Sequence, residues 1–387
     1  MNKKVIAGVV AVVLLAGGAF AYSSSENLQG KFSPTKFSAP AISGTSPTPI
    51  KSGPFGSPFT GGSASVTSID GLEFQVSSAT PRSDILVLGH DDQELAVFKV
   101  TANDYDFEIT DLVLTMDSSS DDNIHTMYVE YENEDGDTVL DRGYPASGEL
   151  SFSGLEMFIP ADDDAEFIVY TDLNLGADGG DSGDTFAIEL DEVEALNLDD
   201  GSVSTATSIG EVANEMTVYE SKPVFSLSSS SPSGSRSVSA TDSVFVFDVE
   251  ALEGEDVLIN DLMINLSSDG SFMLFSTISA YLKEGSTTVS TTSDFVSDTS
   301  EASMNFTTMA AYGDIIVEEG TTKTFTIEMN TIALMDDTVS DDYLTLSIDL
   351  GSATSPAKTN WTDGSTSRIK WVGYVSDSSL NSNTLVY

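Results

Sequence analysis

The sequence predicts an all-β protein that contains two tandem antiparallel β-sandwiches with Ig-like topology. Short stretches alternate between apolar and polar residues, turn residues separate them at a spacing of about 8 to 12 residues, and helical periodicity is confined to the N-terminal segment. The folded part also contains an internal repeat: residues 95–102 are similar to 244–251, and residues 109–114 are similar to 259–264. A repeat of this length implies two copies of one domain.

Residues 1–21 have the three parts of a secretory signal peptide, namely a basic start, an apolar run and a small-residue exit. Ala19-Phe20-Ala21 fits the cleavage pattern, so we expect the cut after Ala21. A retained anchor or a pilin-type helix is the alternative, although the apolar run is marginal in length for a membrane span. We therefore expect a secreted or cell-surface protein whose mature chain has no membrane span.

Residues 22–63 form a Ser/Pro/Thr/Gly-rich segment, and its prolines exclude a helix or a central strand. We expect an extended arm or linker. Its three lysines and single glutamate make it weakly basic. It is interpreted either as a solvated spacer or as an assembly arm that docks on the acidic body of another copy, through Lys31, Phe32, Lys36 and Phe37.

Residues 64–222 and 223–387 are the two predicted sandwich domains. In both copies the alternation buries the same face of the matched strand, through Ala96, Phe98, Val100 and Ala102 in the first and Phe245, Phe247, Val249 and Ala251 in the second. A slip of one residue would turn every such side chain to the wrong face of the strand. The shared alternation of buried and exposed positions is therefore stronger evidence for a repeated domain than identical residues are. Strand reversals are predicted at Asp135-Gly136, Glu284-Gly285 and Glu319-Gly320.

Composition limits the function classes. The chain has no cysteine, which excludes disulfides, thiolate metal sites and cysteine nucleophiles. Its 62 acidic and 15 basic residues give a net charge of −47. A field of this sign repels nucleic acid and anionic lipid and attracts divalent cations.

Three acidic loops are candidate Ca²⁺ sites, because each places several oxygen ligands around a turn that glycine permits. None matches the twelve-residue EF-hand loop, and each can also be interpreted as a solvated hairpin tip. Calcium is the only cofactor that the sequence suggests. The candidate ligands are Glu132, Asp135, Asp137, Asp178, Asp181, Asp184, Asp199 and Asp200.

Catalysis has little support in the sequence. His90 and His125 lie beside acidic runs, but the chain has no nucleophile elbow, zinc-binding His-Glu-x-x-His or phosphate-binding glycine loop. With so many acidic residues, a pair of carboxylates at any spacing is uninformative. The protein is therefore predicted not to be an enzyme.

Two tryptophans flank an acidic turn in the second copy. Trp361 and Trp371, with Tyr374 nearby, could form a platform for stacking on a sugar or another partner. The alternative is that they close the end of the sandwich core. Three Asn-x-Ser/Thr sequons, at Asn265, Asn305 and Asn360, also lie in the second copy.

The junction of the copies, Asn-Glu-Met-Thr-Val-Tyr-Glu-Ser-Lys-Pro-Val-Phe-Ser-Leu at 214–227, is followed by Val-Phe-Val-Phe-Asp-Val-Glu-Ala at 244–251. These two segments resemble the sequences of tandem Ig-like cell-surface proteins of patescibacteria, the candidate phyla radiation. The resemblance covers roughly residues 64–387. It implies an exported cell-envelope protein of the S-layer or appendage type, and it carries over no catalytic residue.

The leading hypothesis is a secreted structural subunit that self-assembles into a cell-surface layer or an extracellular filament. The alternative is an Ig-like adhesin or glycan-binding module, with a secreted hydrolase as the third hypothesis. The expected partners are further copies of the chain or a surface glycan, and not nucleic acid.

Overall fold

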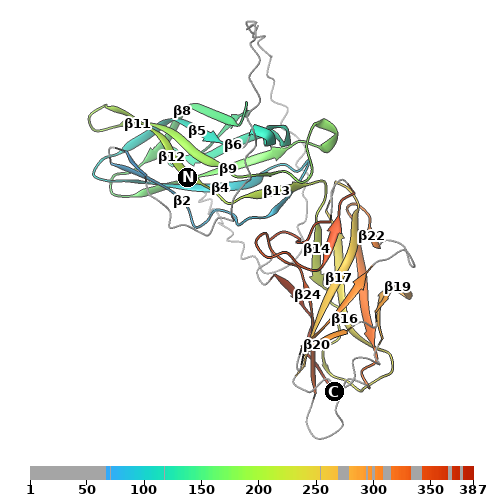
Figure 1. Ribbon diagram of the computed structural model, residues 1–387. Coiled ribbons are helices and arrows are strands. Elements are labelled where there is room, and N and C mark those ends of the chain that lie inside the picture. The colour runs from blue at the N-terminus through green and yellow to red at the C-terminus, as the bar shows by residue number, and fades with distance from the viewer. Residues whose placement is uncertain are drawn as a thin grey trace, which may run out of the picture. The chain divides into compact units, whose positions relative to one another are not determined.

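The computed structural model describes residues 67–387 apart from 70, 117, 253, 269–278, 293–294, 299–300, 308–314, 333–341, 365–367 and 375–377. The predicted signal peptide and arm, including Lys31, Phe32, Lys36 and Phe37, lie outside the described residues. Within the described part the regular elements are β-strands and two short 3-10 helices, η1 (Ser118–Asn123) and η2 (Gly176–Asp178). This confirms the predicted all-β class (Figure 1). None of the described helices is long and apolar enough to span a membrane.

Where the structure describes the first copy, its strands form two large sheets and one small one. The first sheet has the order β1 (Thr67–Ile69), β2 (Leu72–Val76), β4 (Gln93–Ala102), β9 (Asp164–Leu173), β6 (Ile124–Glu132) and β7 (Thr138–Gly143). The second has the order β12 (Val203–Val212), β11 (Glu189–Asn197), β5 (Phe107–Thr115) and β8 (Glu149–Ile159). The small sheet has the order β10 (Thr185–Phe186), β13 (Met216–Tyr219) and β3 (Ile85–Val87).

The described residues of the second copy form two sheets. One has the order β14 (Pro223–Leu227), β16 (Asp242–Ala251), β23 (Thr322–Met329), β18 (Ala280–Glu284) and β19 (Thr287–Thr292). The other has the order β15 (Gly234–Ser235), β27 (Leu385–Val386), β24 (Tyr343–Asp349), β17 (Val257–Ser268), β21 (Glu301–Thr307) and β20 (Phe295–Asp298). Three further strands pair beside this path: β22 (Ile315–Val317) and β25 (Asn360–Thr362) with β17, and β26 (Ser379–Asn381) with β24.

The two copies share a strand order, which is the structural counterpart of the sequence repeat. The path β2-β4-β9-β6-β7 in the first copy corresponds to β14-β16-β23-β18-β19 in the second. A short strand pairs in parallel with the last strand in both cases, β3 with β13 and β15 with β27. The repeated sequences therefore occupy matched positions, because 95–102 lies in β4 and 244–251 lies in β16.

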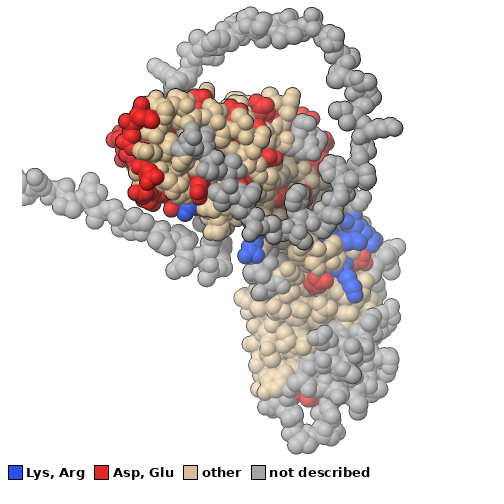
Figure 2. All heavy atoms as spheres, turned by 60° about the vertical axis from the view of Figure 1, so that its left-hand side comes forward, with Lys and Arg blue, Asp and Glu red and all other residues tan. Residues whose placement is uncertain are grey.

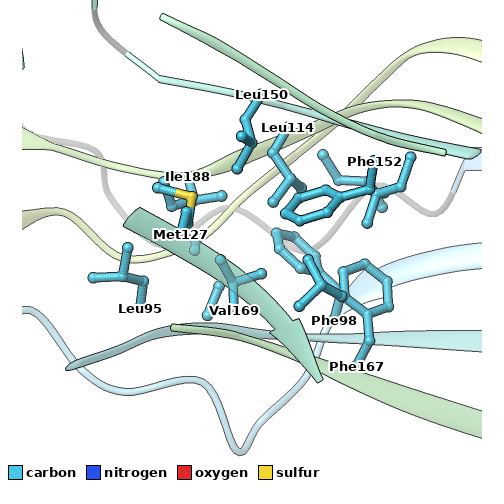
Figure 3. Close-up of a cluster of buried hydrophobic side chains, with 14 of the residues drawn as sticks. Leu95, Phe98, Leu114, Met127, Leu150, Phe152, Phe167, Val169 and Ile188 are labelled. Atoms are coloured by element: carbon cyan, nitrogen blue, oxygen red, sulfur yellow. The ribbon is translucent and has the colours of Figure 1, made fainter. Parts of the chain in front are cut away.

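The described residues form two hydrophobic cores, each built mainly from the inward faces of one copy's strands. In the first core Phe98 stacks on Phe167 with ring centroids 5.2 Å apart, and in the second Phe247 stacks on Phe325 at 5.7 Å. Figure 3 shows Phe98 and Phe167 pointing towards Phe152 of the opposite sheet. The four stacked rings are almost completely buried, so the predicted parity is confirmed in both copies.

At the predicted strand reversals the glycines adopt positive φ angles. Gly136 joins β6 to β7 with φ +74°, Gly285 joins β18 to β19 with φ +57°, and Gly320 precedes β23 with φ +63°. This left-handed region is sterically costly for other residues, which is why glycine stands at these turns.

We expect Phe98→Ala to lower the free energy of unfolding by about 3–5 kcal/mol, because it removes a fully buried ring and leaves a cavity. Chemical denaturation of the full chain measures this effect. Tyr105, which is 47% exposed, provides the control, and Tyr105→Ala should change stability by at most about 0.5 kcal/mol. Equal effects of the two substitutions would contradict this assignment of the core.

Candidate functional site

The candidate Ca²⁺ residues lie in three separate loops of the first copy. Glu132, Asp135 and Asp137 are exposed around the β6–β7 hairpin, where Asn133 Oδ1 accepts hydrogen bonds from the backbone N–H groups of Asp135 and Asp137. Asn197 Oδ1 likewise accepts hydrogen bonds from the backbone N–H groups of Asp199 and Asp200. These asparagines therefore account for the turn geometry without an ion.

The third loop follows η2, which contains Asp178. Asn123 accepts a hydrogen bond from the Asp181 backbone N–H and donates one to the Asp184 carboxylate. In the described part of the chain, no three His, Asp or Glu side chains are grouped so that they could hold a metal ion. Calcium binding therefore stays a prediction from the sequence.

The predicted platform of Trp361, Trp371 and Tyr374 is not formed. Trp361 is 1% exposed, and its Nε1–H donates a 2.8 Å hydrogen bond to the Trp371 carbonyl. Its ring packs inside the second core, so no sugar can stack on it, and the prediction is wrong for this residue. Trp371 is half-buried against the same core, whereas Tyr374 is 46% exposed. The core-closing alternative fits Trp361.

Acidic charge is concentrated in the first copy. Residues 64–222 contain 38 acidic and 4 basic residues, compared with 23 and 6 in residues 223–387. Figure 2 shows acidic residues gathered over the first copy. The first copy is therefore where a cationic partner would experience the strongest attraction.

A group of acidic and aromatic side chains lies on the outer face of the first sheet, which we call the acid–aromatic face: Glu94, Glu130, Tyr128 and Tyr170. Three neighbouring strands, β4, β9 and β6, bring it together. Tyr170 lies directly opposite both Glu94 and Tyr128. Glu130 follows Tyr128 on the same face of β6, since residues two apart in a strand share a face.

The two carboxylates of this face repel each other. Burial raises the pKa of the Glu94 carboxyl, and the neighbouring Glu130 raises it further. Burial also raises the pKa of the Tyr170 hydroxyl, and the negative charges of Glu130 and Glu94 raise it further. None of the ion pairs found among the described residues includes Glu94 or Glu130.

The neighbouring tyrosine already carries a cation. The Arg142 guanidinium lies 5.1 Å from the ring centroid of Tyr128, within the range of a cation–π interaction. The hydroxyl of Tyr128 donates to the Asp172 carboxylate. Tyr170 offers a similar ring with two carboxylates beside it. This arrangement suits a lysine or arginine side chain supplied by another molecule.

A hollow of about 270 Å³ adjoins the start of β4. Its lining includes His90, Gln93 and Glu94. The sequence did not indicate this site, because Glu94, Glu130 and Tyr170 are far apart in the chain and each stands in an ordinary strand.

No protein-family profile matches the chain, and no curated protein matches it. Among solved structures, the partial N-terminal region of an enterococcal surface protein is 9% identical, with 82% of this chain and 94% of that chain covered and a TM-score of 0.22. The collagen adhesin of S. aureus is 9% identical, with coverages of 83% and 92% and a TM-score of 0.17.

A collagen-binding domain of an Erysipelothrix rhusiopathiae surface protein is 10% identical, with coverages of 82% and 94% and a TM-score of 0.18. These similar structures are domains of bacterial surface proteins. At such TM-scores the likeness carries no argument about the activity of this chain. The patescibacterial resemblance stays a prediction from the sequence.

We expect Glu130→Gln to lower the pKa of Glu94, because the substitution removes the neighbouring negative charge and leaves burial unchanged. An NMR titration of the side-chain carboxyl carbons measures this shift. Glu73→Gln, at an exposed position of β2, is the control and should leave the Glu94 titration unchanged. An unchanged Glu94 pKa in Glu130→Gln would show that the charge of Glu130 does not act on the Glu94 carboxyl, which would contradict this assignment.

Proposed function

We propose that this chain is an exported, non-enzymatic binding module of the adhesin type, and that its first copy binds a cationic group of an extracellular partner. The observation that carries this proposal is the acid–aromatic face, where Glu94 and Glu130 lie beside Tyr170. A lysine or arginine side chain placed there would gain two carboxylates and the face of an aromatic ring.

The charge distribution supports the same conclusion. The excess of acidic residues in the first copy would attract a basic partner over several ångströms and accelerate its association. The acid–aromatic face would then fix its position. Long-range attraction and local contacts thus favour the same class of partner.

The double substitution Glu94→Gln/Glu130→Gln should weaken binding of a synthetic lysine-rich peptide by about three- to tenfold, because two ion contacts are lost. Biolayer interferometry on the full chain measures the dissociation constant. Glu250→Gln/Glu255→Gln removes the same charge from exposed positions of the second copy and is the matched control. Equal weakening in both variants would indicate attraction by net charge alone and would overturn the proposed site.

Peptide binding should also depend on pH with a defined sign. The pKa of Glu94 is raised, so its carboxyl is charged above that value and becomes neutral as the pH falls through it. As the pH falls, binding should therefore begin to weaken at a higher pH than it would if Glu94 had the pKa of an ordinary glutamate. Glu94→Gln should remove this part of the profile, and identical profiles for the two proteins would show that Glu94 does not contribute.

A structural subunit of a surface layer or filament is the second candidate function. Its arm-docking version depends on residues 22–63, which lie outside the described part. One feature would favour contact between copies: the second copy carries about half the net negative charge of the first, so two second copies repel each other less than two first copies do.

A further inference from the structure

An acidic side chain is buried where the two large sheets of the first copy meet. Among the described strands, β12 lies at the edge of its sheet and pairs with β11. It also contacts β1 and β2, which belong to the other sheet. Ile209 of β12 is part of the first core, and Glu211, two residues later, is buried as well. We call the contact between the end of β12 and β2 the seam.

Glu211 connects the two sheets across this seam. It is 3% exposed, and its Oε1 has no hydrogen-bond partner among the described residues. The backbone N–H of Val76, the last residue of β2, donates a hydrogen bond to the Glu211 carboxyl. A buried carboxylate with one unsatisfied oxygen costs free energy, whereas the neutral acid is much less costly to bury.

The strands in contact with β12 supply only further negative charge. Glu211 is the only charged residue of β12, β1 has none, and β2 has Glu73. The charged residues of β11 are Glu189, Asp191, Glu192 and Glu194. None of the ion pairs found among the described residues includes Glu211. Burial raises the pKa of the Glu211 carboxyl, and the hydrogen bond from Val76 opposes this rise.

The matched position of the second copy holds a leucine. The repeat aligns Leu190 of β11 with Ile348 of β24, since each pairs with the last residue of the repeated segment in β5 or β17. Glu211 is the partner of Leu190 on the other side, and Leu380 of β26 is the partner of Ile348. Leu380 packs against the second core, and β26 contacts β14, the counterpart of β2. An apolar side chain thus closes the same seam in the second copy, so the fold does not require a carboxyl there.

The pairing of β12 is irregular directly before Glu211. The register between β11 and β12 shifts between Leu190 and Glu192. On the β12 side of this bulge, Ser208 and Gly210 have φ angles of +59° and +77°. A left-handed backbone is costly for serine, and a bulge disrupts the ladder locally. The end of β12 therefore has less support from β11 than a regular strand would have, and its contact with β2 matters more.

We propose that Glu211 is a pH-sensitive link between the two large sheets of the first copy, closed when its carboxyl is neutral and weakened when the carboxyl is charged. The neutral group keeps the hydrogen bond from Val76 and fills the seam, as Leu380 does in the second copy. The charged group gains hydration when it reaches water, and for that the end of β12 must separate from β2. This inference goes beyond the proposed binding function and does not depend on it.

The direction of the pH dependence follows from the direction of the pKa shift. Because the pKa of Glu211 is raised in the folded protein, its stabilising effect is complete below the ordinary pKa of glutamate. That effect is lost as the pH rises through the raised pKa. The seam is therefore most stable in acid and opens more often towards neutral and alkaline pH.

Hydrogen exchange of the full chain, followed by mass spectrometry, measures local opening of β12 and β2. After correction for the intrinsic pH dependence of amide exchange, the opening equilibrium of Ile209–Val212 should rise several-fold between about pH 4.5 and about pH 8. The segment around Val76 should follow the same trend. An opening equilibrium that stays constant or falls over this range would overturn the proposal.

A matched pair of substitutions separates Glu211 from the general charge of the protein. Glu211→Gln keeps an oxygen for the Val76 N–H but cannot ionise, so the rise with pH should disappear. Glu215→Gln removes the same charge at an exposed position nearby and should keep the rise. This control is needed because the protein has 62 acidic residues, whose mutual repulsion also grows with pH. The same rise in both variants would assign the opening to general repulsion and would overturn the proposal.

Glu211→Leu provides a second test in case glutamine disturbs the seam by itself. It introduces the residue type that closes the matched seam of the second copy, and it removes the buried oxygen that lacks a partner. At about pH 8 this variant should open several-fold less often than the unmodified chain, with no rise as the pH increases. Thermal unfolding confirms that each variant is folded. More frequent opening than in the unmodified chain at this pH would show that the charged carboxylate stabilises the seam, which contradicts the proposal.

Discussion

Both halves of this protein depend on one cross-strand contact, the stacking of two phenylalanines on adjacent central strands. Phe98 and Phe167 make it in the first copy, and Phe247 and Phe325 make it in the second. These rings fix which face of each central strand is buried, because a slip of one residue would expose them and bury polar neighbours. The pairing of the outer strands follows from that choice. A common interior arrangement can therefore be kept while the surfaces differ.

The surfaces have diverged on this common interior. One face of the first copy brings Glu94 and Glu130 to Tyr170. In another row the first copy has Glu149, Thr115 and Glu189, where the second copy has Ser303, Asn265 and Ser347. Since salt screens attraction between opposite charges, the acidic surface of the first copy should attract a cation less strongly as the ionic strength rises.

Some of the site could be predicted from the sequence and some could not. The excess of acidic residues in the first copy is visible in its composition, but the arrangement of Glu94, Glu130 and Tyr170 depends on the order β4-β9-β6. Trp361 was a reasonable candidate for an exposed platform, because an acidic turn follows it. The pairing of β25 with β17 turns it into the core instead.

The sequence by itself determined the all-β class, the repeat, the buried faces of β4 and β16 and the glycine turns at Gly136 and Gly285, because these depend on local periodicity and backbone sterics. Only the tertiary structure decided which strands are neighbours. That decision placed Ser347 beside Asn265 and Tyr170 beside Glu94. The physical reason is that a period of two residues specifies the face of a strand, whereas strand pairing is a non-local contact that the alternation does not encode.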